Sequence, residues 1–208
     1  MCLGGQVEMK VIVVTGGIGS GKSSACRFLE KEYGWPVYYA DDKVKELYGR
    51  SPDLLNRIEE ALDGRFRDEN GVFVPSLLAA VIFSDKSALD KVESLVFPEL
   101  ISDFDQWKAE LGTDYVILES ATILEKPSLK GVGDITVLVD APLGVRAARA
   151  ASRDSVSEEE IIRRMSRQPL MNSLSLIGEY PDVDMVIIND STEADLQEKL
   201  RKMAGNLL

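Results

Sequence analysis

Residues 16–23 read Gly16-Gly17-Ile18-Gly19-Ser20-Gly21-Lys22-Ser23 and fit the pattern G-x-x-x-x-G-K-[ST]. They follow the apolar run Val11 to Val14, which predicts a strand, and they precede a stretch with helical periodicity. Glycines let the backbone turn with its N–H groups pointing inward, and the N-terminus of the next helix adds a positive dipole end. The run therefore predicts a loop that binds a polyphosphate, with Lys22 reaching the outer phosphates and Ser23 holding Mg²⁺.

Short β-rich runs alternate with longer helical stretches over the rest of the chain. Five runs predict strands: Val11 to Val14, Val37 to Tyr39, Tyr115 to Leu118, Ile135 to Val139 and Met185 to Ile188. Continuous apolar strands separated by helices are typical of a parallel sheet covered on both faces. The predicted fold class is therefore α/β, a three-layer sandwich of the P-loop NTPase type with a five-stranded parallel sheet.

A chain of 208 residues predicts a single domain with room for helical additions to its core. Residues 43–112 are too long for one crossover helix, and their apolar residues recur at helical spacing, so they predict an inserted helical lobe. Residues 143–180 predict a helical lid. The core is assigned to residues 9–42, 113–142 and 181–208, and residues 1–8 are given no function.

The composition excludes several classes of function. With 24 Lys and Arg against 35 Asp and Glu, the formal net charge of -11 opposes non-specific binding to nucleic acid and to anionic membranes. No apolar run is long enough to span a bilayer and no signal peptide is recognisable, so a cytoplasmic location is expected. The absence of histidine excludes His-based triads, His metal sites and imidazole bases. Cys2 and Cys26 support neither a disulfide framework nor a zinc site.

Two carboxylates follow predicted strands, at the edge where an open parallel sheet binds its ligands. Asp41 follows the second strand, where it can orient or deprotonate a hydroxyl that attacks the γ-phosphate. Capping the next helix is the alternative for Asp41, although Asp42 is the better candidate for that cap. Glu119 ends the third strand, where it can hold a magnesium-bound water, and anchoring the loop is its alternative.

Arginines are concentrated after the fourth strand. Arg146, Arg149 and Arg153 fall at i, i+3 and i+7, which places them on one face of a helix. Arginines on a mobile helix can stabilise the charge that phosphoryl transfer spreads over oxygens, while excluding water. Ser157 to Glu160 predicts a capping box that opens a second helix with further arginines. Solvated arginines paired with those glutamates are the alternative interpretation.

Further motifs stand in a defined order along the chain: Thr15 to Ser23, Ala40-Asp41, Ile123-Leu124-Glu125, Arg149, Arg153-Asp154 with the following Ser-Glu-Glu, Gln168, and Val186 to Asp190. In order and spacing they resemble the dephospho-coenzyme A kinase family, over nearly the whole folded part of the chain. The combination is much more specific than the glycine-rich loop alone. The family divides into a core, a helical substrate lobe and a lid, which matches the organisation expected above.

The resemblance implies transfer of the γ-phosphoryl group of ATP to the 3′-hydroxyl of the ribose in dephospho-coenzyme A, the last step of coenzyme A synthesis. ATP and Mg²⁺ are the implied cofactors. The implied catalytic residues are Asp41, Lys22, Arg149 and Arg153. The residues expected at the cofactors are Gly17, Gly19, Ser20, Gly21, Lys22, Ser23 and Ser24 for ATP, and Ser23 and Glu119 for the metal. The expected partner is this small molecule, with neither nucleic acid nor membrane, and the protein is expected to be a monomer or a small homo-oligomer.

Three departures from the pattern of the family fall in its substrate region. Tyr39-Ala40-Asp41 stands where many members read Asp-Ala-Asp, Phe97-Pro98 where many read His-Pro, and Ala121 where many carry proline. The ATP-binding motifs are intact. Two other functions stay open: a P-loop kinase that acts on a nucleoside, a nucleotide or a sugar, and a nucleotide-binding regulatory module that phosphorylates no metabolite.

Overall fold

The computed structural model describes residues 9–168 and 182–208. The chain splits into two compact units, which we call the core unit (residues up to Tyr39 and from Gly112 onward) and the helical unit (Ala40–Leu111). The helical unit spans nearly the residues of the predicted substrate lobe, and its substrate role stays a prediction. Residues 169–180 of the predicted lid, residue 181 of the predicted core and residues 1–8 lie outside the described residues.

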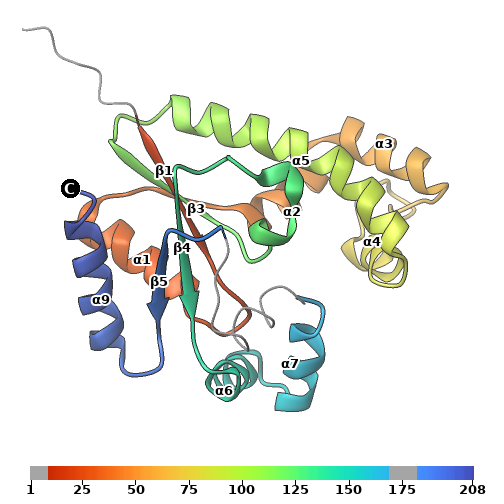
Figure 1. The fold of residues 1–208 in the computed structure, drawn as a ribbon. Helices are drawn as coiled ribbons and strands as arrows, with labels where there is room; N and C mark the ends of the chain where they lie inside the picture. The colour runs from red at the N-terminus through yellow and green to blue at the C-terminus, as the bar shows by residue number, and fades with distance from the viewer. Residues whose placement is uncertain (1–8, 169–181) are drawn as a thin grey trace, which may run out of the picture. The chain divides into compact units, whose positions relative to one another are not determined.

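A five-stranded sheet with the order β2-β3-β1-β4-β5 forms the centre of the core unit, and all its strands are parallel (Figure 1). The strands are β1 (Lys10–Thr15), β2 (Val37–Tyr39), β3 (Tyr115–Glu119), β4 (Ile135–Asp140) and β5 (Met185–Ile188). Each coincides with a predicted run to within one residue at either end. The predicted α/β class with a five-stranded parallel sheet is therefore confirmed.

The register of the sheet brings the ends of the strands together. Val14 pairs with Glu119, and Glu119 pairs with Tyr39. On the other side of β1, Asp140 ends β4 opposite Ile188 of β5. Because parallel strands all end at the same edge, the loops that follow them lie close to one another there.

Two helices, α1 (Lys22–Tyr33) and α9 (Glu193–Gly205), pack against one face of this sheet and against each other. That face carries alternate residues of the strands, such as Ile12 and Val14, as the period of two of a strand requires. From α1 the buried residues include Ala25 and Leu29. Burial raises the pKa of the Cys26 thiol on the same helix, so Cys26 is a packing residue.

Helices α6 (Leu143–Asp154) and α7 (Glu158–Met165) follow β4 in the core unit. Ser157 caps α7 by accepting a hydrogen bond from the N–H of Glu160 at 3.2 Å, which confirms the predicted start of this helix. A small apolar cluster joins the two helices, and its buried members are Ala147, Ala150, Ile161 and Met165. The two helices are thus packed as a pair.

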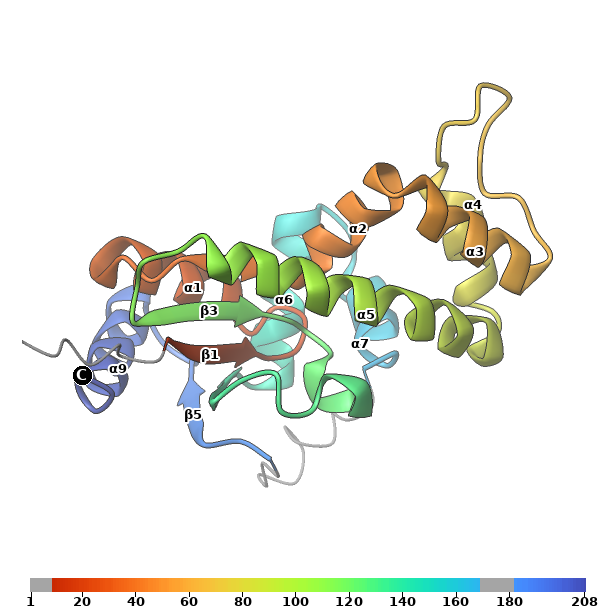
Figure 2. The same ribbon diagram turned by 90° about the horizontal axis from the view of Figure 1, so that it is seen from above.

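The helical unit consists of α2 (Ala40–Arg50), α3 (Pro52–Leu62), α4 (Pro75–Ile82) and α5 (Lys86–Ala109), which Figure 2 shows from above. Every fourth residue of α5 is buried, from Ala88 to Phe104, so one stripe of this helix faces the interior. The ion pair between Arg57 Nη2 and Glu99 Oε1, at 2.5 Å, links α3 to α5. Neither α5 nor any other helix of the described residues has the length and apolarity that crossing a membrane requires.

The packing of α9 on the sheet gives a stability prediction. Leu200 is 0% exposed within the apolar cluster, whereas Leu208 at the end of the chain is 77% exposed. Leu200→Ala should lower the free energy of unfolding by about 2–5 kcal/mol, because it removes buried methyl groups and leaves a cavity. Leu208→Ala should change it by less than about 0.5 kcal/mol. Urea denaturation of both variants measures the difference, and equal effects would contradict this assignment of the core.

Candidate active site

The glycine-rich loop joins β1 to α1 with its backbone in conformations that favour glycine. Gly19 and Gly21 have φ angles of 76° and 99°. Gly21 is the N-cap residue of α1. Because it has no side chain, it accepts no hydrogen bond from the N–H groups of the first turn. A helix N-terminus with such backbone donors is suited to bind an anion.

An open cleft of about 290 Å³ lies beside the loop. Its lining residues are Gly19, Gly21, Lys22, Ser23, Ser24, Arg27, Arg149, Ala150 and Arg153. The structure therefore brings the second half of the loop together with two arginines of α6. Gly17 and Ser20, also predicted to bind ATP, do not belong to this lining. Sequence analysis missed Arg27, whose position one helical turn after Ser23 was the available signal.

Lys22 and Glu119 form an ion pair at the carboxyl edge of the sheet. Lys22 Nζ lies 3.5 Å from Glu119 Oε1, and the two side chains are only 15% and 7% exposed. Because little water reaches them, the attraction between the two charges is stronger than in a surface pair. The ion pair links the loop to the end of β3, and this contact supports the alternative role of Glu119 as a loop anchor.

The acidic residues of the described chain form no group of three or more that could hold a metal ion by themselves. Ser23 and Glu119 offer a hydroxyl and a carboxylate oxygen, which are the hard donors that Mg²⁺ prefers. Mg²⁺ is usually bound by one or two protein groups together with substrate phosphates, rather than by a complete protein cage. The residues present thus fit a magnesium ion that arrives with a polyphosphate.

Arg149 and Arg153 line the cleft from α6, but their hydrogen bonds differ. Arg149 donates from Nη1 to the carbonyl of Asn189 at 2.7 Å and from Nη2 to that of Ser191 at 3.3 Å. Arg153 donates from Nε to Asp154 Oδ1 at 2.7 Å, and this bond lowers the pKa of Asp154. Asp154 also pairs with Arg164 of α7, at 3.1 Å. Arg149 is thus held by backbone carbonyls, whereas Arg153 is 66% exposed and Arg164 also pairs with Glu160, so the alternative of solvated arginines paired with glutamates describes part of this group.

Arg146 departs from the predicted arginine stripe. Its side chain is 0% exposed, and Nε donates to the carbonyl of Ile18 in the loop at 3.0 Å. Nη1 lies 3.8 Å from Asp140 Oδ1 at the end of β4. Burial lowers the pKa of Arg146, and Asp140 opposes that shift. Arg146 therefore lies under the loop and, unlike Arg149 and Arg153, does not line the cleft.

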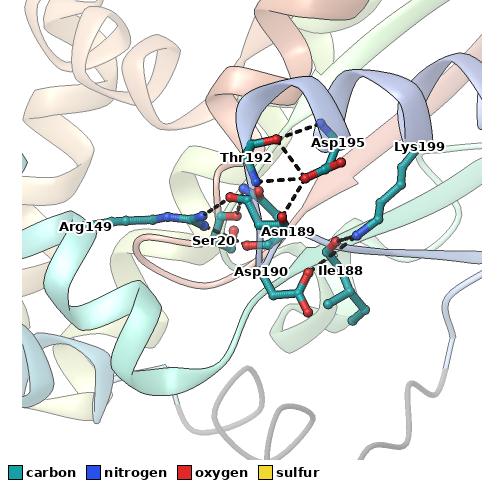
Figure 3. Close-up of polar contacts among 9 residues, drawn as sticks. Ser20, Arg149, Ile188, Asn189, Asp190, Thr192, Asp195 and Lys199 are labelled. Carbon is teal, nitrogen blue, oxygen red and sulfur yellow. Dashed lines mark hydrogen bonds and ion pairs between the residues drawn. The ribbon is translucent and has the colours of Figure 1, made fainter.

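Asn189 is a second residue under the loop, and sequence analysis gave it no role beyond its place in a motif. It is 7% exposed, and its Nδ2 donates to the carbonyl of Ser20 at 2.8 Å. Figure 3 shows Asn189 next to Ser20 and Arg149, and the Asn189 carbonyl accepts the hydrogen bond from the Arg149 guanidinium. The signal in the sequence was a polar residue directly after the last apolar strand.

Asp41 belongs to the helical unit, where it is exposed in the first turn of α2. Asp42 stands in the same turn and pairs with Lys45 at 2.7 Å. Because α2 begins at Ala40, the prediction that Asp42 caps this helix is wrong. Tyr39 is a phenol and not a carboxylate, and burial raises its pKa to about 12, so its side chain carries no negative charge near neutral pH.

The close packing of Asn189 on the loop gives a prediction. A Cβ atom on Gly21 would lie 2.2 Å from Asn189 Nδ2, at a φ of +99° that side chains rarely adopt. Gly21→Ala should therefore weaken the binding of Mg-ATP at least about tenfold, since the strained loop must shift. Gly49→Ala is the matched control, because nothing lies within 4 Å of that Cβ position. Calorimetric titration measures both, and unchanged affinity in Gly21→Ala would refute the packing argument.

The family model and two similar proteins point to the same family. A family model described as dephospho-CoA kinase matches residues 10–195. A dephospho-CoA kinase of Porphyromonas gingivalis is 39% identical over 170 residues, 82% of this chain and 83% of that protein. One of Salinibacter ruber is 33% identical over 194 residues, 92% of this chain and 94% of that protein.

Solved structures share the fold. TT1252 of Thermus thermophilus has a TM-score of 0.80 at 27% identity and covers 97% of this chain, with 99% of its own chain covered. A shikimate kinase of Acinetobacter baumannii has a TM-score of 0.52 at 16% identity, with 96% of each chain covered, so it shows the fold alone. The match of the family model and the identity to relatives over most of their length show that the chain belongs to the dephospho-CoA kinase family.

Proposed function

We propose that this protein is an ATP-dependent phosphotransferase that phosphorylates the 3′-hydroxyl of the ribose in dephospho-CoA, the last step of coenzyme A biosynthesis. Membership of the family supports the reaction. The observation that carries the proposal onto this chain is the cleft in which Lys22 and Ser23 of the loop meet Arg149 and Arg153. A phosphate-binding loop facing two arginines is an arrangement suited to phosphoryl transfer.

The donor ATP is proposed to bind with its phosphates on the loop. Gly19, Gly21 and Ser24 would present backbone and hydroxyl donors along the cleft, with Gly17 and Ser20 shaping the loop. Lys22 would bind the β- and γ-phosphates and so exchange part of its attraction to Glu119 for attraction to ATP. Ser23 and Glu119 would hold Mg²⁺, which supplies charge neutralisation between the outer phosphates when bound.

Arg149 and Arg153 are proposed to stabilise the charge on the transferred phosphoryl group. During transfer, negative charge spreads over the three equatorial oxygens, and guanidinium groups at the cleft can donate to them. Arg149 is already oriented by the carbonyls of Asn189 and Ser191, so it needs little reorganisation to act. Donors that are oriented beforehand stabilise a transition state most effectively.

Asp41 is proposed to orient the ribose hydroxyl and to accept its proton. It follows the end of β2 by only two residues, and this strand ends in register with Glu119. Consecutive Cα atoms are about 3.8 Å apart, so the Cα of Asp41 lies within about 7.6 Å of that of Tyr39. The tether supports a role of Asp41 at the carboxyl edge, whereas Asp42 in the same turn is paired with Lys45.

The experiment that tests the function is a mass-spectrometric assay with Mg-ATP and a panel of acceptors: dephospho-CoA, nucleosides, nucleoside monophosphates, gluconate and shikimate. A product one phosphate heavier, formed from dephospho-CoA alone, is expected. Lys22→Met, prepared in the same way, should give no product, which excludes a contaminating kinase. Transfer only to another acceptor would mean a different small-molecule kinase, and ATP binding without any transfer would favour a regulatory module.

The proposed role of Asp41 predicts a loss of turnover without a loss of nucleotide. Asp41→Asn should lower kcat by at least about a hundredfold, since a positioned base contributes factors of this size, while the Kd for Mg-ATP stays within about threefold. Asp42→Asn is the matched control on the same turn of α2, and its kcat should change by less than about threefold. Steady-state kinetics and calorimetry measure the two effects, and a kcat of Asp41→Asn near that of the parent protein would refute the role.

A further inference from the structure

The peptide groups on both sides of Ile18 are held by side chains from outside the loop. The carbonyl of Ile18 accepts a hydrogen bond from Arg146 Nε at 3.0 Å, and its N–H donates to Gln168 Oε1 at 3.2 Å. Arg146 lies in the first turn of α6, and Gln168 follows the end of α7 by three residues. Ile18, at a variable position of the loop motif, is thus hydrogen-bonded to α6 and to the segment directly after α7.

The Ile18 side chain makes a third tie to the same helices. It packs against the small cluster of Ala147, Ala150, Ile161 and Met165 that joins α6 to α7. Shifting the loop would therefore break two hydrogen bonds and expose apolar surface at the same time. Ile18 therefore fixes the position of the loop relative to α6, the helix that carries Arg149 and Arg153.

Arg146 also determines the shape of the loop around Ile18. A Cβ atom on Gly17 would lie 1.8 Å from Arg146 Nη2, and one on Gly19 would lie 2.1 Å from the Arg146 carbonyl oxygen. The backbone at these two glycines thus lies directly against a fully buried arginine. Burying a guanidinium costs free energy unless it is paired and hydrogen-bonded. For Arg146, the hydrogen bond to the Ile18 carbonyl and the nearby Asp140 carboxylate offset part of this cost.

The loop consequently has two halves with different tasks. In the first half, the N–H of Ile18 is already bonded to Gln168, and neither Gly17 nor Ile18 lines the cleft. In the second half, Gly19, Gly21 and Lys22 line the cleft, where their N–H groups can meet an anion. The first half fixes the position from which the second half turns toward its ligand.

We propose that Arg146 and Gln168 are positioning residues that clamp the Ile18 peptide and so keep the loop ready for the phosphates of ATP. The proposal rests on the proposed function, since it assigns these residues to the ATP site of the kinase. Arg146 thereby has a different task from Arg149 and Arg153, although all three stand on α6.

The test compares two replacements of Arg146 that differ in one property. Gln carries its amide nitrogen the same number of bonds from Cβ as Arg Nε, so Arg146→Gln can still donate to the Ile18 carbonyl. Arg146→Met places an apolar group there. Arg146→Met should raise the Kd for Mg-ATP at least about tenfold, and Arg146→Gln should bring it back to within about threefold of the parent protein.

Kinetics separates positioning from a general loss of structure. In Arg146→Met the KM for ATP should rise with the Kd, while kcat at saturating ATP stays within about threefold. Lower stability alone would reduce the active fraction, and with it kcat, without raising KM. Lys202→Met, which removes an exposed cation of α9, is the matched control and should leave all three constants unchanged.

Gln168 provides an independent arm in case Arg146→Met fails to fold. Gln168→Met should weaken Mg-ATP binding by about threefold or more, because it removes the acceptor of the Ile18 N–H. Where Arg146→Met folds, its effect on the Kd and that of Gln168→Met should be non-additive in the double variant, since both residues hold one peptide. Unchanged Kd in Gln168→Met, or equal losses in Arg146→Met and Arg146→Gln at intact thermal stability, would overturn the clamp.

The Kd for Mg-ATP is measured in the absence of dephospho-CoA. The clamp and the proposed function can therefore be refuted independently of each other. If the parent protein binds ATP but does not phosphorylate dephospho-CoA, the proposed function is wrong while the clamp is still decided by the Kd values. If the parent protein does not bind Mg-ATP at all, both are wrong.

Discussion

The active-site loop can adopt its observed form only with glycines, because neighbouring residues occupy the space that side chains at these positions would need. A Cβ at Gly17 or Gly19 would overlap Arg146, and one at Gly21 would overlap Asn189. The two residues that fill this space come from the first turn of α6 and from the end of β5. Glycine is thus required here twice, for the positive φ at Gly19 and Gly21 and for the close approach of buried polar side chains.

The parallel sheet makes this packing possible. Segments separated by more than a hundred residues, such as Ser20 and Asn189, meet because every strand of the sheet ends at the same edge. The same edge receives Glu119 beside Lys22 and Asp140 beside Arg146, so two buried or half-buried cations each lie near a carboxylate. Lys22, Arg27, Arg149 and Arg153 line the cleft, so a chain with a net charge of -11 still presents positive side chains where an anionic nucleotide would bind.

Family membership and fold contribute different parts of the functional conclusion. A shikimate kinase shares this fold at 16% identity, so the fold by itself does not identify the acceptor. The acceptor follows from the family, two members of which match this chain over most of their length at 39% and 33% identity. The structure adds what neither comparison supplies, namely which arginine of α6 lines the cleft and which one supports the loop.

The sequence alone determined the five parallel strands, the loop between β1 and α1, and the start of α7, because these depend on local patterns: apolar runs, a glycine motif and a capping serine. It also placed Lys22, Ser23, Arg149 and Arg153 among the candidates, and the structure brings those four to one cleft. The separation of Arg146 from its two neighbours was decided only by the tertiary structure. Three and seven residues advance a helix by about 4.5 and 10.5 Å, so Arg146 lies under the loop while Arg149 and Arg153 reach the cleft beside it. The roles of Asn189 and Gln168 were likewise invisible, because their partners are backbone atoms of a loop about 150 residues or more away in the chain, and no local pattern records such a contact.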